Sequence, residues 1–313
     1  MNFIYSPVSN VYQLSKRVLG WVIAGVITLT HPYVIAQETT GPDKIIISGA
    51  SGQLGGLTVQ ALLERGVKPE NLILVSRTPD QLERYAKLGA SVRFGDFTKP
   101  ESLPAAYAGG TRMLLISINS GGTLRSQLHK TAIDAAKQAG VKHIAYTSFV
   151  NMDNNTSPIA NDHRITENDL KASGLAWTML RNHVYMDGQV AQAARMVAEG
   201  RAVVPPNETL MGYVTRADCA AAAAAVLSTP GHEYKAYDIT GPELIGVRQI
   251  AEAASAVTGK PIEIVAGTET PGGFRMSGDF FSVTSSAVAD LTGRPATSIR
   301  DLLVANKDKL LPQ

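Results

Sequence analysis

The stretch Lys44-Ile45-Ile46-Ile47-Ser48-Gly49-Ala50-Ser51-Gly52-Gln53-Leu54-Gly55 decides the fold class of this chain. An apolar run rich in β-branched residues enters a turn with three glycines. Apolar residues then recur at helical spacing from Leu57 to Leu63. A strand, a glycine-rich turn and a helix in this order are typical of a dinucleotide-binding site.

The three glycines would each have a separate role in such a site. Gly49 permits a tight turn, Gly52 lets the backbone approach a pyrophosphate, and Gly55 lets the helix pack closely on the strand. The pyrophosphate would lie at the free N–H groups of the helix N-terminus. The other predicted cofactor contacts of this turn are Ser51, Gln53 and Leu54.

Strand-like and helix-like segments alternate from Asp43 onward, which is the pattern of βαβ units in a parallel sheet. Strands are predicted at Lys44–Ser48, Leu72–Ser76, Ser91–Phe94, Met113–Ile118, Ile144–Ser148 and Ala176–Leu180. Helices are predicted at Gly55–Arg65, Pro79–Leu88, Pro100–Tyr107, Ser126–Ala139 and Asn161–Ser173. The predicted fold class is α/β, a doubly wound parallel sheet of the Rossmann type.

The pattern loosens after Asn182. Helices are predicted at Met186–Gly200, Arg216–Ser228, Val247–Thr258, Thr284–Leu291 and Ser298–Leu310, with short extended segments at Val203–Val204, Lys235–Thr240 and Ile262–Val265. These strands are too few and too short for a second sheet of useful size. We therefore predict a Rossmann domain over 43–182, with later returns to it near 214–240. Residues 183–313 would mainly form a small C-terminal lobe that caps the substrate cleft.

Residues 1–36 have the pattern of a secretory leader. Lys16 and Arg17 precede an apolar run from Val18 to Thr30, and Val34-Ile35-Ala36 offers small residues for a signal peptidase. The expected consequence is export to the periplasm or beyond the cell. An uncleaved membrane anchor, which would leave the protein tethered, and a cytoplasmic protein are the alternatives.

Charge and cysteine content exclude several classes of protein. The two basic residues of the leader account for the whole excess of 29 basic over 27 acidic residues, so the rest of the chain is neutral. Without a basic patch or a zinc-finger spacing, no nucleic-acid partner is predicted. Cys219 is the only cysteine, which rules out a disulfide within one chain and predicts a buried, inert thiol. No metal site is predicted.

The end of the second predicted strand indicates which dinucleotide is bound. An NAD site usually has an acidic residue there for the ribose hydroxyls, but this chain has Val75-Ser76-Arg77-Thr78. The guanidinium of Arg77 suits a 2′-phosphate, with Ser76 and Thr78 as supporting donors, so NADPH is favoured over NADH. A solvated arginine is the alternative. Asp96 could bind the adenine amino group or simply form a turn.

Several motifs together resemble a known family. They are the glycine turn Gly49–Gly55, Leu114-Leu115-Ile116-Ser117, the run from Ala139 to Ser148 with Tyr146-Thr147-Ser148, Asp162-His163 with Thr166-Glu167, Leu180-Arg181-Asn182, Thr215-Arg216-Ala217-Asp218 and Leu291-Thr292-Gly293-Arg294-Pro295. From Lys44 to about Asn306 the chain resembles atypical short-chain dehydrogenases of the NmrA-like group, in particular NADPH-dependent quinone oxidoreductases (type 2) and triphenylmethane dye reductases.

The resemblance also shows a departure from ordinary short-chain dehydrogenases. These enzymes use a Tyr four residues before a Lys, whose charge lowers the pKa of the Tyr. Aligned through Glu167, the two positions here hold Ile159 and His163. A substrate that accepts hydride with little help from an acid, such as a quinone or a cationic dye, fits this loss. His163 would hold the ribose or donate a proton near neutral pH; a histidine packed without chemistry is the alternative.

The resemblance implies further site residues at the ends of the predicted strands. Thr147 and Ser148 would both face the nicotinamide, Asn182 would orient its carboxamide, and Ser117 would contact the cofactor. A partly aromatic substrate pocket would be lined by Phe149, His183, Tyr185 and Met186. The segment from Gly267 to Gly278 is shorter than its counterpart in the resembled reductases, so we expect a more open cleft.

The leading hypothesis is an NADPH-dependent reductase that transfers hydride to a quinone or a similar conjugated electrophile. A non-catalytic NADP(H)-sensing regulator of the NmrA-like kind is a second hypothesis, since it too would lack the Tyr and Lys. A lyase or isomerase that retains its NADP is a third. The expected partner is a small-molecule substrate, and a homodimer is possible.

Overall fold

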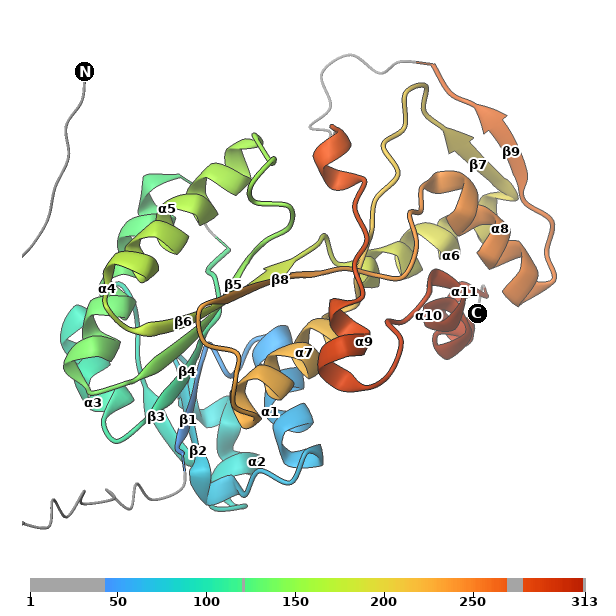
Figure 1. Ribbon diagram of the computed structural model, residues 1–313. Helices are drawn as coiled ribbons and strands as arrows, with labels where there is room; N and C mark the ends of the chain where they lie inside the picture. The colour runs from blue at the N-terminus through green and yellow to red at the C-terminus, as the bar shows by residue number, and fades with distance from the viewer. Residues whose placement is uncertain (1–42, 120–121, 269–277, 312–313) are drawn as a thin grey trace, which may run out of the picture. The chain divides into compact units, whose positions relative to one another are not determined.

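The computed structural model describes residues 43–119, 122–268 and 278–311 (Figure 1). The predicted leader, residues 1–36, lies outside the described residues, as does most of the segment from Gly267 to Gly278.

The centre of the fold is a parallel sheet of seven strands in the order β3-β2-β1-β4-β5-β6-β8. The strands are β1 (Ile45–Ser48), β2 (Leu72–Ser76), β3 (Ser91–Phe94), β4 (Arg112–Leu115), β5 (His143–Phe149), β6 (Ala176–Asn182) and β8 (Lys235–Ile239). The strand order reverses between β1 and β4, where doubly wound folds bind ligands. This topology confirms the predicted fold class.

Helices cover both faces of the sheet (Figure 1). On one face pack α1 (Gln53–Glu64), α2 (Glu83–Ala86), α7 (Arg216–Ser228) and α9 (Ala287–Thr292). On the other pack α3 (Leu103–Tyr107), α4 (Thr123–Gln138) and α5 (Pro158–Ala172). The 3₁₀ turns η1 (Pro69–Asn71), η2 (Pro79–Leu82) and η3 (Pro100–Ser102) precede β2, α2 and α3. Because both faces are covered, β1, β2, β4 and β5 are buried along their whole length, and β1 and β2 are almost entirely apolar.

The C-terminal part of the chain contributes to two regions. Helix α7 packs on the Rossmann sheet, β8 is its last strand, and α9 joins them from further along the chain. The rest has its own apolar core and a two-stranded parallel sheet, β7 with β9. Its elements are η4 (Met186–Gly188), α6 (Gln189–Glu199), β7 (Arg201–Val204), α8 (Val247–Thr258), β9 (Glu263–Ala266), η5 (Asp279–Phe281), α10 (Ile299–Ala305) and α11 (Lys307–Leu310).

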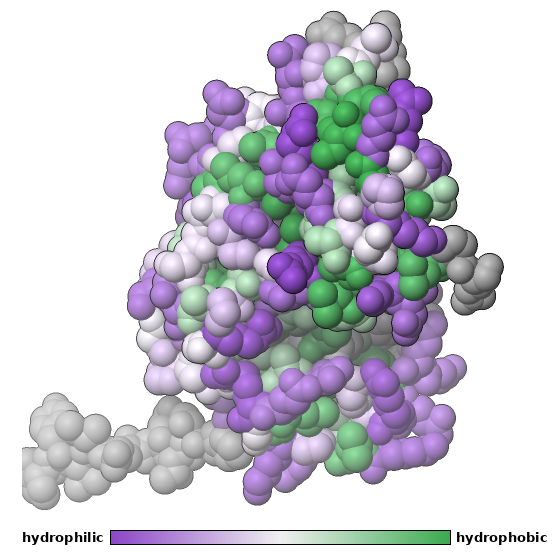
Figure 2. All heavy atoms as spheres, turned by 90° about the vertical axis from the view of Figure 1, so that its right-hand side faces the viewer, coloured by the Kyte–Doolittle hydropathy of each residue, from purple (hydrophilic) through white to green (hydrophobic). Residues whose placement is uncertain are grey.

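The surface of this C-terminal region alternates hydrophobic and hydrophilic patches (Figure 2). Its exposed large hydrophobic side chains include Val203 on β7 and Val304 on α10. Of the helices in the described part of the chain, none has the length and hydrophobicity to span a bilayer. Cys219 lies buried on α7, where burial raises the pKa of its thiol, as expected for an inert cysteine.

Candidate active site

The glycine turn has the geometry of a dinucleotide cradle. Gly49 has a φ of +87°, which a side chain would disfavour, and the N–H groups of Gly49 and Ala50 both donate to the carbonyl of Val75 at 3.0 Å. A Cβ on Gly55 would lie 2.3 Å from the Gly49 carbonyl oxygen, so only glycine lets α1 pack this closely. Helix α1 begins directly after Gly52, which leaves its first N–H groups free for an anion.

Three hydroxyl groups gather beside this turn at the end of β2. The Ser51 and Ser76 hydroxyls are 2.7 Å apart, and the Thr78 hydroxyl lies 3.2 Å from Ser76 and 3.3 Å from Ser51. Arg77, which lies between Ser76 and Thr78 in the chain, is exposed. The structure therefore brings the three hydroxyls together, with the exposed Arg77 next to two of them in the chain.

Asp96 follows β3 and faces the same region. Its Oδ1 accepts hydrogen bonds from the backbone N–H and the hydroxyl of Thr98 at 2.9 and 2.8 Å, which is the turn geometry that the sequence left open. Burial raises the pKa of the Asp96 carboxyl, but these bonds and the charges of Arg77 and Lys99 outweigh it and lower the pKa overall. Asp96 and Arg77 are thus electrostatic neighbours.

A cavity of about 580 Å³ opens beside the first turn of α1. It is lined by Gln53, Leu57, Asp187, Gly188 and Arg216. The Arg216 guanidinium lies over the Tyr185 ring, 4.4 Å from its centroid, and 3.5 Å from the Asp187 carboxylate. Tyr185, which was predicted to line a substrate pocket, is not among the residues lining this cavity but packs against Arg216, which is.

Thr147 and Ser148 do not face the same way. The Thr147 hydroxyl accepts a hydrogen bond from the backbone N–H of Ser117 at 2.8 Å and lies 3.2 Å from the Ser117 hydroxyl, at the ends of β4 and β5. The Ser148 hydroxyl instead donates to Glu167 on α5 at 2.7 Å. The prediction that both face the nicotinamide is wrong for Ser148, because successive side chains of a strand point to opposite faces.

Glu167 is the centre of a buried ionic network. Arg181 donates two hydrogen bonds to its carboxylate, from Nε and Nη2, both at 3.0 Å. Arg181 also pairs with the exposed Asp153 at 3.2 Å. Ser148 completes this network, so its role in the structure is to satisfy a buried carboxylate.

His163 lies on α5 with 5% of its surface exposed. Its ring stacks on Phe149 with centroids 5.9 Å apart, and its Nδ1 lies 2.7 Å from the Tyr146 hydroxyl. Burial, with the charges of Arg125 and His129 added, lowers the pKa of His163 to about 3. At neutral pH the ring is therefore uncharged, so His163 could act there only as a neutral imidazole, whether it holds the ribose or donates a proton.

Tyr146 and His129 were not predicted as site residues. The hydroxyl of Tyr146 is fully buried, and burial raises its pKa far above the ordinary value. A tyrosine thus does lie beside His163, but it comes from β5 and is no tuned acid. Ile159, at the position of the usual tyrosine, packs in an apolar cluster with Phe149 and Phe281. The signal that could have revealed Tyr146 is its alternation with Thr147 on a buried strand.

Asn182 ends β6 with a buried carbonyl oxygen that has no hydrogen-bond partner within the described residues. A buried acceptor without a donor is costly, by about 1–3 kcal/mol. A primary amide, such as the nicotinamide carboxamide, would supply the missing N–H. This orphaned acceptor, the glycine cradle and the hydroxyls at the end of β2 fit a bound NAD(P)H.

Two predicted substrate residues have structural roles. His183 is buried, its Nδ1 accepts from the Val184 N–H at 2.7 Å and its Nε2 donates to the Phe281 carbonyl at 2.8 Å. Met186 is 1% exposed and packs in the core of the C-terminal region. Both side chains are thus buried in packing and hydrogen-bonding contacts, and their assignment as pocket walls stays a prediction.

An aromatic wall that the sequence did not predict stands beside Phe149. The Phe281 ring packs edge-on against the Phe149 ring, with ring centroids 6.0 Å apart. The ring centroids of Phe280 and Phe281 are 4.6 Å apart. His183 and Asn151 hold the backbone carbonyls of Phe281 and Phe280. These two phenylalanines follow the glycine-rich segment and place aromatic rings beside Phe149, whereas the expectation of a more open cleft concerns residues that lie mostly outside the described ones.

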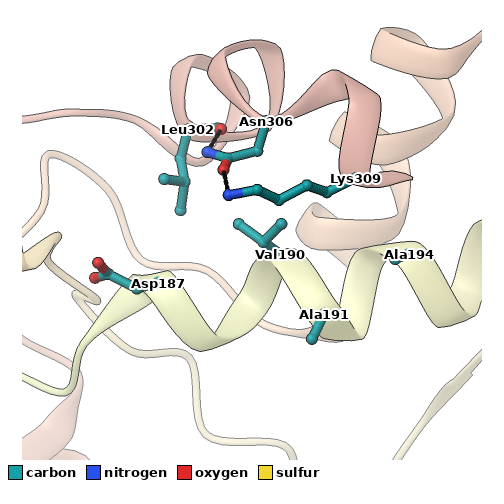
Figure 3. Close-up of a pocket in the computed structure, with 7 residues that line it drawn as sticks. All are labelled: Asp187, Val190, Ala191, Ala194, Leu302, Asn306 and Lys309. Carbon is teal, nitrogen blue, oxygen red and sulfur yellow. Dashed lines mark hydrogen bonds between the residues drawn. The ribbon is translucent and has the colours of Figure 1, made fainter. Parts of the chain in front are cut away.

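A second cavity, of about 550 Å³, lies between α6 and the pair α10 and α11 (Figure 3). It is lined by Asp187, Val190, Ala191, Ala194, Leu302, Asn306 and Lys309. Lys309 donates to the Asn306 side chain at 2.7 Å across one end. It shares Asp187 with the cavity at α1, but its other lining residues come from α6 and from the pair α10 and α11. Among the residues described, no cluster of His, Cys, Asp and Glu could hold a metal ion.

Comparison with known proteins agrees with this geometry. The NAD(P)H-binding family matches residues 49–230, which is more than half of the chain and includes the glycine turn. The chain belongs to this family. It is an NmrA-like member of the atypical short-chain dehydrogenases, as the resemblance implied.

Among curated relatives, quinone oxidoreductase 2 of Escherichia coli is 35% identical over 218 residues, covering 70% of this chain and 76% of that protein. The NAD(P)H azoreductase of Xenophilus azovorans is 26% identical over 284 residues, covering 84% and 97%. Among solved structures, triphenylmethane reductase of Citrobacter sp. complexed with NADP(H) superposes with a TM-score of 0.76 at 31% identity, covering 84% of this chain and 99% of that one. The protein is thus an NAD(P)H-binding reductase by relationship.

Proposed function

We propose that the protein is an NADPH-dependent reductase that transfers hydride to a quinone or a similar conjugated electrophile. The observation that carries the proposal is that, within the part of the chain that the structure describes, no poised acid lies beside Phe149. His163 is neutral, and Tyr146 keeps its proton in a buried hydrogen bond. A substrate whose reduced form is a stable anion needs no such acid, since water can supply the proton afterwards.

The preference for NADPH rests on the group of side chains around Arg77. An exposed guanidinium between two hydroxyls suits a 2′-phosphate, whereas no acidic side chain stands at the end of β2 for a free ribose. When bound, the nicotinamide supplies the hydride. Asn182 and Thr147 would hold its ring, and Phe149 with Phe281 would orient a flat substrate and exclude water.

The relatives support the same reaction class. Quinone oxidoreductase 2, azoreductase and triphenylmethane reductase are named for three different conjugated acceptors. What their names share is reduction of an extended π system, so we propose a planar conjugated substrate and leave its ring chemistry to experiment.

The test is stopped-flow loss of NADPH absorbance with a panel of quinones, azo dyes and triphenylmethane dyes. We expect turnover with at least one quinone and faster reduction by NADPH than by NADH. If none of the acceptors is reduced by the purified protein while NADPH still binds, the proposed activity is refuted.

An NADP(H) sensor is the second candidate, because the same neutral His163 and missing Tyr would serve a protein that binds without reacting. Photosystem II assembly factor Ycf39 of Cyanophora paradoxa, 27% identical over 186 residues, is a relative named for a role other than reduction. Calorimetry separates the two: a strong preference between NADP⁺ and NADPH without any turnover would favour the sensor.

A further inference from the structure

His163 is the end of a buried chain of hydrogen bonds that begins at a backbone N–H. The Ile118 N–H donates to Nε2 of His129 at 3.1 Å. His129 is fully buried, and its Nδ1 lies 3.1 Å from the Thr166 hydroxyl and 3.4 Å from the Tyr146 hydroxyl. The Tyr146 hydroxyl in turn lies 2.7 Å from Nδ1 of His163.

The first bond fixes the tautomer of His129. A backbone N–H can only donate, so Nε2 of His129 must be the acceptor and carries no proton. The neutral ring of His129 then carries its proton on Nδ1 and donates it to Thr166 and Tyr146. The Tyr146 hydroxyl lies beside the Thr166 hydroxyl, 3.4 Å from Nδ1 of His129 and 2.7 Å from Nδ1 of His163, and we assign its own proton to the shortest of these contacts, the one to His163.

We infer that Tyr146 and His129 are positioning residues that hold His163 as the tautomer protonated on Nε2. His163 is then a fixed hydrogen-bond donor and not an acid. No described residue takes the Nε2 proton. The ring stacks on Phe149 at the carboxyl end of β5, the edge at which doubly wound folds hold their ligands.

The consequence for the reaction rests on the proposed function. Hydride transfer to a quinone leaves a negative charge on a quinone oxygen. A donor that is already oriented stabilises that charge without reorganising, whereas a freely flipping imidazole would present an acceptor half of the time. The locked ring therefore favours substrates with an oxygen or nitrogen that becomes negative on reduction.

The test is nitrogen NMR of the full protein labelled with ¹⁵N-histidine, with His163→Gln and His129→Gln used to assign the signals. We expect a protonated Nε2 and a bare Nδ1 in His163, and the opposite pattern in His129. Tyr146→Phe removes the donor, so His163 should become a mixture of tautomers, and kcat/KM for the best acceptor should fall about three- to tenfold while NADPH affinity is unchanged.

Tyr107→Phe is the matched control. Tyr107 is fully buried in the same apolar cluster as Tyr146, and its hydroxyl has no hydrogen-bond partner within the described residues. Its removal should leave the His163 signals unchanged. Finding His163 protonated on Nδ1, or unaffected by Tyr146→Phe, would overturn the inference. The NMR result is independent of turnover, so failure of the proposed reaction and failure of the lock are distinguishable.

Discussion

At the scale of single residues, two neighbouring glycines of α1 show how differently the same residue type can be constrained. A Cβ on Gly55 would lie 2.3 Å from the Gly49 carbonyl oxygen and 2.8 Å from the Ala50 Cα, both in the backbone of the cofactor turn. A Cβ on Gly56 would come no closer than 3.9 Å to the Ala50 carbonyl oxygen. Of these two glycines, only Gly55 is required for α1 to pack closely against the turn.

Gly55→Ala should destabilise the protein by about 1–3 kcal/mol, because α1 must move away from the turn. It should also weaken NADPH binding, since the free N–H groups of α1 move with the helix. Gly56→Ala is the control and should be neutral or stabilising by up to about 1 kcal/mol, because alanine favours helix. Urea unfolding and NADPH titration measure both effects; equal behaviour of the two variants would contradict the close-packing argument.

Arg77→Ala should raise KM for NADPH about 10- to 100-fold and change KM for NADH little, because only the 2′-phosphate would lose a charged hydrogen bond. Lys68→Ala is the matched control, since Lys68 is an exposed cation at the opposite end of β2. Steady-state kinetics with both cofactors decide the point. Equal losses for NADPH and NADH would show that Arg77 does not read the phosphate.

At the scale of elements, β5 shows how one strand serves both the site and the core. Thr147 meets the end of β4, whereas Tyr146 and Ser148 point toward α5 and meet His163 and Glu167. The strand thus divides its residues between a ligand edge and a buried polar layer under α5.

Ser148→Ala should leave kcat within about twofold, since its hydroxyl serves Glu167, but should lower stability by about 1.5–3 kcal/mol through loss of a bond to a buried carboxylate. Thr147→Val is the comparison, because it removes the bond to Ser117 at the cofactor edge and should raise KM for NADPH. If Ser148→Ala lost much of its kcat while its free energy of unfolding stayed normal, the result would support the original prediction that Ser148 contacts the nicotinamide.

The sequence predicts the strands well because each is a short apolar run bounded by turn residues, and β2, β3 and α7 match their predicted bounds. Helix ends are less exact: the segment predicted at Ser298–Leu310 divides at Asn306 into α10 and α11. The glycine turn is a local pattern that the sequence reveals directly, and the role of Arg77 stays a prediction drawn from its place after the second strand. The pairing of His163 with Tyr146, or of His183 with Phe281, joins distant segments, and only tertiary packing reveals it.

At the scale of the whole molecule, four buried histidines are kept neutral by the fold. Burial, with nearby positive charge in some cases, lowers the pKa of His129 and His163 to about 3, and that of His143 and His183 to about 4. In the unfolded chain each of these rings has an ordinary pKa near 6.5. Below that pH the unfolded chain binds more protons than the folded protein.

The free energy of unfolding should therefore show no loss from these histidines above about pH 7. It should fall as the pH drops from about 6.5 toward 4, by up to about 1.4 kcal/mol per pH unit for each of them. Urea midpoints at pH 7.5, 6.5, 5.5 and 5.0 measure the slope. His163→Gln removes one of the four groups that take up a proton on unfolding. It should therefore lower the slope of the free energy of unfolding against pH by up to about 1.4 kcal/mol per pH unit, whatever its effect on stability at pH 7.5. A midpoint that stays constant between pH 7 and 5 would contradict the buried neutral state.

The position of Phe281 in the chain has a consequence for how the protein is made. The glycine turn and the first six strands are complete by Asn182, whereas the aromatic partner of Phe149 follows about 100 residues later. At ribosomal rates of about 5–20 residues per second, this gap lasts roughly 5–20 s. During that interval the nascent chain would already hold its nucleotide cradle, and its choice of electron acceptor would be the last property it acquires.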